Sequence, residues 1–245
     1  MRANRVPTGA RESASSGFRA GLRVSGARRK FYPMMVDVAG RRCLVVGGGR
    51  VAERKALSLV ECGAQVELSS PTTTARLAAL ATAGRLRLRR RPVRPSDLRG
   101  AFLVVVATDD AQVNREVAGA VRRAGGLVNV ADDPDACTFL VPSVVRRGDL
   151  TIAISTAGGS PALAKKLRQR LEQTIGPEYE AFLGVLRALR ERARQAIADP
   201  EERQALYRRA VDSDLFEHVA RGDPVAVAAR IEDLLQAAPR AGAGA

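Results

Sequence analysis

Three consecutive glycines follow a short apolar run and precede a helix-like sequence, and such a loop could hold a phosphate group or merely turn the chain. The segment reads VVGGGRVAERKA, residues 45–56. Gly47, Gly49 and Ala52 fit the G-x-G-x-x-A pattern: a tight turn, a close backbone approach to a pyrophosphate, and a small residue for helix–strand packing. The partial positive charge of the helix N-terminus would add to phosphate binding. A plain tight turn is the alternative.

Two later apolar runs end in acidic side chains: Asp109 and Asp110 after one, Asp132 after the next. Because parallel strands end at a common edge of their sheet, we expect these acids near the glycine loop. A carboxylate there could accept a proton in a redox reaction or help to hold a metal ion. The structural alternatives are a helix N-cap for Asp109 and Asp110, and a turn before Pro134 for Asp132.

One residue expected at a dinucleotide site is missing. The second strand should end in an acid that holds the adenine ribose. Residues 67–72 read ELSSPT, with no acid at the strand tip, and we expect Glu67 to be an exposed strand residue. Since no arginine stands at the tip either, NAD is expected in preference to NADP.

Strand-like and helix-like segments alternate over the first half of the chain, which predicts an α/β fold with a Rossmann-like, doubly wound parallel sheet. The segment 85–91 alternates Arg with Leu and predicts a half-exposed edge strand. The predicted strands cover 43–46, 65–69, 85–91, 102–107 and 127–130, and the predicted helices cover 51–61, 74–83 and 113–124.

The pattern changes after Pro142. Two more strands are predicted over 143–147 and 150–155, and Ser160–Pro161 has the cap and first-turn proline that begin a helix. Further helices are predicted over 178–197, 200–211 and 224–236. A small α+β region and a helical C-terminal domain therefore follow the sheet.

The composition excludes several classes of protein. The 245 residues are 46% hydrophobic, enough for one or two cores, and no apolar run approaches the roughly 18 residues of a membrane helix. Three widely spaced cysteines indicate a reducing compartment, and a single histidine argues against a His-based triad or metal cluster. We expect a soluble cytoplasmic protein with no metal ligand set.

The net charge of +14 is unevenly spread, which weakens a nucleic-acid interpretation. Residues 1–30 carry eight Lys/Arg against one Glu, residues 176–245 carry ten against twelve acids, and the middle carries twenty-two against thirteen. Aromatic residues make up only 4%. A small anion would suit the basic middle as well as DNA, and we expect neither a nucleic-acid nor a membrane partner.

Both ends of the chain lack hydrophobic periodicity. Residues 1–30 are predicted to be a disordered basic extension, or to follow from a start codon assigned too early, since Met34 and Met35 lie just downstream. A targeting peptide is the minority interpretation. Residues 237–245 are predicted to be a disordered tail.

Four blocks of the sequence resemble one known protein family in order and spacing. They read FYPMMVDVAGRRCLVVGGGRVAERKA, ATDDAQVN, NVADDPDACTFLVPSVV and LTIAISTAGGSPALAKKLR. The stretch 31–172 is similar to the dehydrogenase and chelatase part of siroheme synthase, the precorrin-2 dehydrogenase / sirohydrochlorin ferrochelatase family. The resemblance implies NAD-dependent oxidation of precorrin-2 to sirohydrochlorin. Insertion of Fe²⁺, as a second substrate, is implied only for bifunctional members, and dehydrogenase-only members share these motifs.

The resemblance also implies roles for particular residues. Asp132 matches the catalytic aspartate, which would also serve metal insertion if that activity is present. The cofactor side comprises Gly47, Gly49, Arg50, Val51, Pro71, Thr72, Thr108 and Asp109. The substrate side comprises Ser155, Thr156, Gly158, Gly159 and Ser160. Basic candidates for the carboxylates of the tetrapyrrole are Arg146, Arg147, Lys165, Lys166 and Arg168, with a solvated basic face as the alternative.

The implied organisation is an NAD-binding domain over 31–142, a dimerisation region over 143–175 that pairs two chains into a homodimer, and a helical domain over 176–236. A different class of protein, an NAD-sensing regulatory module without catalysis, remains the alternative. Such modules share the glycine loop, but they have no need of the NVADDPDACTF and STAGGSP blocks.

Overall fold

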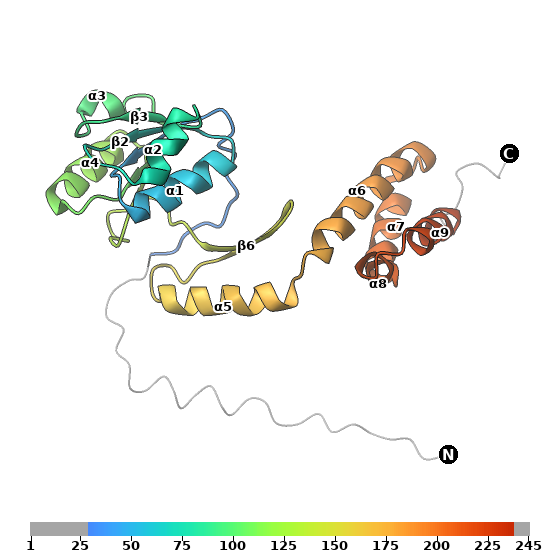
Figure 1. The fold of residues 1–245 in the computed structure, drawn as a ribbon. Helices are drawn as coiled ribbons and strands as arrows, with labels where there is room; N and C mark the ends of the chain where they lie inside the picture. Colours follow the sequence, from blue (N-terminus) through green and yellow to red (C-terminus); the bar gives the residue numbers. More distant parts are fainter. Residues whose placement is uncertain (1–28, 238–245) are drawn as a thin grey trace, which may run out of the picture. The chain divides into compact units, whose positions relative to one another are not determined.

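The computed structural model describes residues 29–237 and contains the predicted parallel sheet (Figure 1). Its strand order is β3-β2-β1-β4-β5, and every neighbouring pair is parallel. The strands are β1 Arg42–Val46, β2 Gln65–Ser69, β3 Arg87–Arg89, β4 Leu103–Val106 and β5 Leu127–Val130. The helices among them are α1 Arg50–Glu61, α2 Ala75–Thr82, α3 Pro95–Leu98 and α4 Ala111–Arg123.

Both faces of the sheet are covered, which is why its inner strands are continuously apolar. Alternate residues of β1 point to opposite faces: Cys43 packs with Ala52 of α1, and Leu44 packs with Val117 of α4. The helices α1 and α2 therefore cover one face, while α3 and α4 cover the other (Figure 1). As predicted, β3 is an edge strand, but it is shorter than the alternating Arg/Leu run.

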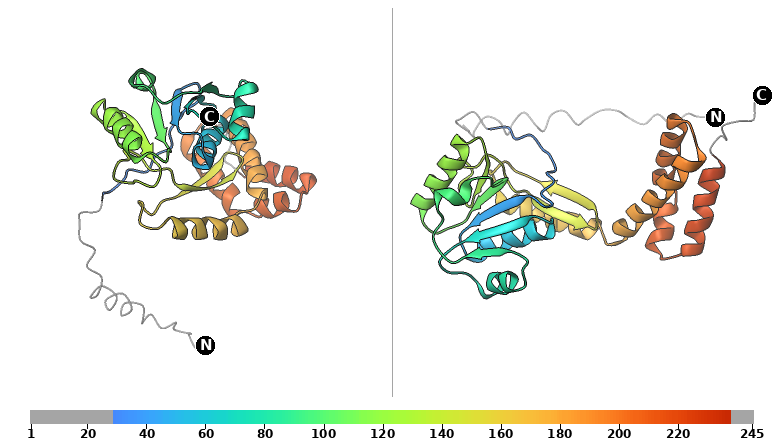
Figure 2. Two further views of the ribbon diagram at one scale, coloured as in Figure 1. Left: turned by 60° about the vertical axis from the view of Figure 1, so that its left-hand side comes forward. Right: turned by 90° about the horizontal axis from the view of Figure 1, so that it is seen from above.

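A hairpin follows the sheet domain. Its strands, β6 Ser143–Arg147 and β7 Leu150–Ile154, are antiparallel and turn at Gly148, whose φ of +54° favours glycine. The helix α5, Pro161–Thr174, packs along the hairpin (Figure 2). Its predicted start is confirmed, because the Ser160 side chain accepts a hydrogen bond from the Leu163 N–H.

The last helices form a separate hydrophobic core built around Phe182, Leu189, Leu206, Leu215 and Leu234. They are α6 Glu178–Ala196, α7 Pro200–Asp212, α8 Leu215–Ala220 and α9 Pro224–Gln236. The sequence pattern did not predict the short helices α3 and α8.

Almost all of residues 1–30 and 237–245, for which disorder is predicted, lies outside the described residues. Among the described residues, no helix is long and apolar enough to cross a membrane. All three cysteines carry free thiols.

Candidate functional site

The first two glycines of the loop after β1 are required by the packing of the chain itself. Gly47 has a φ of +115°, and a Cβ there would lie 2.1 Å from the Ala107 carbonyl oxygen. A Cβ on Gly48 would lie 1.9 Å from the Thr72 carbonyl oxygen. The loops after β2 and β4 therefore press directly against the glycine loop.

Gly49 is different, because nothing in the chain requires a glycine there. Its φ of −80° suits any residue, and a Cβ would meet no atom within 4 Å. It is also the N-cap of α1, and no side chain caps that helix. Open space beside uncapped N–H groups at a helix N-terminus fits a phosphate group. The residues present therefore fit a dinucleotide.

Backbone hydrogen bonds bring the loops that follow four strands to the same edge of the sheet. Gly47 N donates to Ser69 O over 3.0 Å, Ala107 N to Val46 O over 2.8 Å, and Ala131 N to Val106 O over 2.8 Å. The predicted cofactor residues Gly47, Gly49, Arg50, Val51, Pro71, Thr72, Thr108 and Asp109 lie on or beside these loops, as does Asp132. The strand order reverses beside β1, and such switch points form ligand crevices in open α/β sheets.

The acidic residues after β4 separate into two kinds. Asp110 is the N-cap of α4, since its carboxylate accepts from the N–H groups of Gln112 and Val113. Asp109 is exposed and takes no part in that cap. Thr108 is fixed through its hydroxyl, 2.7 Å from Asn114 Oδ1. The N-cap interpretation therefore holds for Asp110 and not for Asp109.

Asp132 and Asp133 also differ. The Asp133 carboxylate accepts from Ala136 N over 3.1 Å and so belongs to the turn. Asp132 is exposed and has a φ of +60°, a left-handed conformation that aspartate adopts more readily than most residues. Backbone strain of this kind clusters at active sites and ligand clamps.

Cys137 lies beneath the same turn. Its Sγ is 3.1 Å from Val130 N and 3.2 Å from Asp133 O, and burial raises the pKa of the thiol. Cys137 is therefore a buried thiol that holds the turn in place.

Lys55, in the middle of α1, is a further charged residue that no sequence motif indicated. The side chain is half-buried, and burial is the main cause that lowers its pKa, followed by the positive charge of Arg54. Cys137 and Asp132 act in the opposite direction and raise the pKa of Lys55. One available signal was that Lys55 directly precedes the buried Ala56 and is one of only four lysines beside thirty-six arginines.

The segment 155–160 forms a tight loop between β7 and α5. Ser155 Oγ accepts from Ala157 N, and Thr156 Oγ1 accepts from Ser160 N, each over 3.1 Å. Gly158 has a φ of +83°, and a Cβ there would lie 3.2 Å from the Pro134 side chain. The predicted substrate residues Ser155, Thr156, Gly158, Gly159 and Ser160 therefore lie beside the turn that carries Asp132.

The prediction that Glu67 is exposed was wrong. Its side chain is 12% exposed and lies 2.9 Å from both Arg42 and Arg89. The hydrogen bond from Arg42 is the largest cause of its lowered pKa. Alternation in β2 indicated a solvent-facing side chain, but arginines from the neighbouring strands cover that position. Glu67 is therefore committed to ion pairs and is not the missing ribose ligand.

Asp97 of α3 completes this ion-pair network and is fully buried. Its carboxylate lies 2.6 Å from Arg89 and 2.7 Å from Arg91, and it accepts from Arg94 N over 2.8 Å. These donors, with the Arg91 hydrogen bond as the largest cause, hold the pKa of Asp97 well below its usual range.

Several basic candidates have structural partners. Arg147 donates to the carbonyl oxygens of Ile175 and Glu172, and Arg168 pairs with the Glu172 carboxylate. Lys165 and Lys166 are exposed on α5. The two lysines are thus the better placed of these candidates to meet a ligand.

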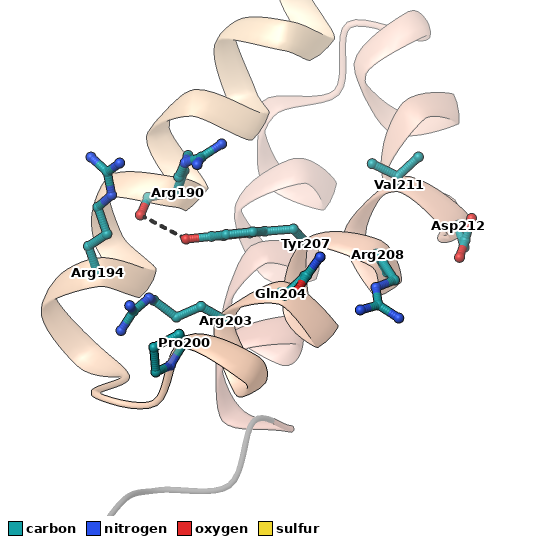
Figure 3. A pocket seen from close by; sticks show the side chains of 9 residues that line it. All are labelled: Arg190, Arg194, Pro200, Arg203, Gln204, Tyr207, Arg208, Val211 and Asp212. Atoms are coloured by element: carbon teal, nitrogen blue, oxygen red, sulfur yellow. Dashed lines mark hydrogen bonds between the residues drawn. The ribbon is translucent and has the colours of Figure 1, made fainter.

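A pocket of about 650 Å³ in the helical region is lined by arginines (Figure 3). Arg203 donates to the carbonyl oxygens of Ile197 and Ala198, both over 2.7 Å. Arg190 stacks 5.4 Å from the Tyr207 ring centre, and its carbonyl oxygen accepts from the Tyr207 hydroxyl. These contacts join α6 to α7, so Arg190 and Arg203 have a structural role in the helical region. The candidate site is therefore the one at the edge of the sheet.

Three family models match successive parts of the chain. A model described as NAD(P)-binding matches residues 34–143, one described as the central part of a sirohaem biosynthesis protein matches 147–174, and one described as the sirohaem synthase dimerisation region matches 178–235. The dimerisation model thus matches the helical region, whereas the resemblance placed dimerisation over 143–175.

Curated relatives and a solved structure agree with these models. The siroheme synthase of Methylococcus capsulatus is 38% identical over 78% of this chain and 40% of its own length, and that of Chromobacterium violaceum is 36% identical over 87% and 46%. This chain thus spans less than half the length of these relatives. A structure described as SirC, precorrin-2 dehydrogenase, is 28% identical with a TM-score of 0.72, and the match covers 84% of this chain and 99% of that one.

Proposed function

The chain belongs to the family formed by the dehydrogenase and chelatase part of siroheme synthase, and we propose that it oxidises precorrin-2 to sirohydrochlorin with NAD⁺. One observation carries this proposal. An open, uncapped helix N-terminus at Gly49 and an unpaired carboxylate at Asp132 lie on loops of one sheet edge.

The cofactor would be held by residues of three loops. The N–H groups that follow Gly49, at Arg50 and Val51, would bind the pyrophosphate. Pro71 and Thr72 would contact the adenosine side, with Thr108 and Asp109 toward the nicotinamide. When bound, NAD⁺ supplies the acceptor for a hydride.

Asp132 would take the proton. The oxidation removes one hydride and one proton from the macrocycle, so a base must accompany the hydride acceptor. Asp132 is exposed after the end of β5, whereas Asp133 accepts a backbone hydrogen bond within the turn. The loop 155–160 would hold the substrate against this carboxylate, because Gly158 lies beside Pro134.

Metal insertion would be a second activity of the same crevice, with Fe²⁺ as the substrate. Among the described residues, no cluster of three or more His, Cys, Asp or Glu could hold a metal ion. The protein's part would therefore be to bind the macrocycle and to let Asp132 accept the pyrrole protons that the metal displaces. Formation of siroheme from sirohydrochlorin and Fe²⁺, followed by its absorbance, tests this activity separately.

We also propose a homodimer in the reducing cytoplasm. The dimerisation model covers residues 178–235, and the free thiols suit a reducing compartment. Light scattering of the purified protein would give the molar mass, and a monomer at micromolar concentration would contradict the dimer.

Incubation of the protein with precorrin-2 and NAD⁺ tests the main activity. We expect the absorbance spectrum of sirohydrochlorin to develop together with NADH at 1:1 stoichiometry, and more slowly with NADP⁺. Binding of NAD⁺ without turnover would instead support the regulatory module. No observation on the structure favours that second candidate.

A further inference from the structure

A carboxylate from α1, that of Glu53, lies beside the segment that follows β2. Glu53 is one turn beyond the open position at Gly49, since Glu53 N donates to Gly49 O over 2.9 Å. Its Oε2 accepts a hydrogen bond from the Thr74 hydroxyl over 2.5 Å, and its side chain is only 20% exposed. Thr74 is the N-cap of α2, the helix that follows β2. The Glu53 carboxylate is therefore held in place by a different element from the one that carries it.

The segment that follows β2 is joined to the glycine loop. Thr74 N donates to Gly48 O over 3.0 Å, and the Ser70 hydroxyl donates to Thr72 O over 2.7 Å. The Thr72 carbonyl oxygen also lies against Gly48, where it leaves no space for a Cβ. In dinucleotide-binding folds of this kind, an acid that follows the second strand holds the adenine ribose. Glu53 brings a carboxylate to this segment, whose own tip has none.

Arg76 of α2 faces the other oxygen of the same carboxylate. Its Nη1 lies 3.9 Å from Glu53 Oε1, and its side chain is 66% exposed. Arg76 is the first arginine after β2, and an arginine in this part of the fold accommodates the 2′-phosphate of NADP. While Glu53 is charged, the pair has no net positive charge to offer a phosphate group.

We propose that Glu53 determines the preference for NAD over NADP, because its carboxylate repels a 2′-phosphate and neutralises the arginine that would otherwise bind one. Specificity built on such a repulsive group is common at binding sites. This inference rests on the proposed function for the identity of the cofactor. Glu67 is not available for the role, since Arg42 and Arg89 bind its carboxylate.

The variant Glu53→Gln tests this assignment, because it removes the charge but keeps an oxygen that can accept from the Thr74 hydroxyl. Calorimetry gives the Kd for NADP⁺ and for NAD⁺. The ratio of the first to the second should fall by about 10–100-fold, the size typical of gaining a hydrogen bond to a charged group. Glu61→Gln, at the exposed end of the same helix, is the matched control and should keep the ratio of the wild type.

A second substitution shows whether Arg76 carries the shift. The double variant Glu53→Gln/Arg76→Ala should return most of the way to the ratio of the wild type, because no guanidinium is left to bind the 2′-phosphate. An unchanged ratio in Glu53→Gln would overturn the assignment, and so would a shift that persists in full in the double variant. Equal weakening of both nucleotides would mean that Glu53 only holds the loop, which also overturns it.

These measurements need no tetrapyrrole, so they separate this inference from the proposed oxidation. A protein that binds NAD⁺ and shows the shift in Glu53→Gln, but does not oxidise precorrin-2, supports the assignment and contradicts the proposed function. A protein that oxidises precorrin-2 with NAD⁺, but shows no shift in Glu53→Gln, contradicts the assignment alone. Failure of the wild type to bind either nucleotide overturns both.

Discussion

At the β3 end of the sheet the acidic side chains are buried and paired, whereas at the β5 end Asp132 is exposed and has no ion pair among the described residues. Asp97 and Glu67 bind four arginines, from β1, β3 and the segments beside them. Asp132 follows β5, and its left-handed backbone (φ +60°) sets it apart from the paired acids of the β3 end.

The difference indicates what each end is for. A buried carboxylate is tolerated when arginines and backbone N–H groups satisfy it, and removing it then leaves cations without a partner. Charges that stay unpaired at the edge of a sheet gain nothing from folding, so a ligand is the better explanation for their position. Variants at the β3 end should therefore change stability, and variants at the β5 end should change activity.

The largest effect is expected for Asp132→Ala. Loss of a general base typically lowers a rate about 10²–10⁴-fold. We expect a decrease of that size in precorrin-2 oxidation under saturating NAD⁺. The midpoint of thermal unfolding should be unchanged or slightly lowered, since alanine adopts the left-handed conformation of this position less readily than aspartate. NAD⁺ affinity, measured by calorimetry, should change little.

Asp133→Ala is the matched control for that variant. It removes only the hydrogen bond from Ala136 N within the turn, so turnover should fall far less. Normal turnover in Asp132→Ala, combined with lost turnover in Asp133→Ala, would show that the base has been assigned to the wrong carboxylate.

At the opposite end, Asp97→Ala should unfold the protein more easily without touching the chemistry. Removing one partner of a buried ion pair typically costs about 3–5 kcal/mol. Arg89 and Arg91 would lose their carboxylate, and Arg94 N its acceptor. Denaturant unfolding would measure the loss, and Asp97→Asn, which keeps the shape, should lose a similar amount. Full stability in both would mean that the network contributes nothing.

The glycine loop follows β1, between the two ends of the sheet. Substitutions at two neighbouring residues of this loop should separate a loss of stability from a loss of NAD⁺ binding. Gly48→Val should destabilise the protein by about 1–3 kcal/mol, because its Cβ would overlap the Thr72 carbonyl. Gly49→Val should keep its stability, since its Cβ enters open space, but should lose NAD⁺ binding in calorimetry. Undiminished NAD⁺ binding by Gly49→Val would mean that this loop only turns the chain.

Most of the fold could be predicted from the sequence because both faces of the sheet are buried. Four predicted strands agree with β1, β2, β4 and β5 to within a residue, since continuous apolar runs admit little else. The short helix α3 was missed because one turn shows no periodicity. The strand β3 was overextended because its Arg/Leu alternation continues beyond the residues that pair with β2.

The candidate site was predictable only where local sequence determines geometry. A glycine pattern at the end of a strand reveals a loop, and the position of Asp132 follows from the strand before it. Glu67 was misjudged because its partner Arg89 comes from a neighbouring strand, and alternation along one strand does not show such a partner. Lys55 was missed because the burial that lowers its pKa depends on tertiary packing, which the pattern along one helix does not show.

The ion pairs of Asp97 and Glu67 at the β3 end should also lose their stabilising effect in acid. The folded-state pKa values of Asp97 and Glu67 are lowered, so their contribution to stability is complete above the unfolded values of about 4 and is lost as the pH falls below them. Each group can add a slope of at most about 1.4 kcal/mol per pH unit. The free energy of unfolding can be measured by chemical denaturation between about pH 3 and about pH 6. It should depend less steeply on pH in Asp97→Asn than in the wild type. An identical slope would contradict the coupling.

The smallest expected effect tests whether burial, and not the mere presence of an ion pair, determines the role of the β3 end. Arg87 and Arg89 both face Glu67, but Arg87 is 73% exposed at 3.7 Å, whereas Arg89 is 26% exposed at 2.9 Å and also binds Asp97. Exposed pairs contribute about 0–1 kcal/mol, because water screens them and the long side chain loses rotamer entropy. Arg87→Ala should therefore shift the unfolding free energy by less than about 0.5 kcal/mol. Arg89→Ala should cost several times more, because it leaves part of the Asp97 carboxylate unsatisfied. Equal losses in the two variants would show that charge count, and not burial, sets the stability of this edge.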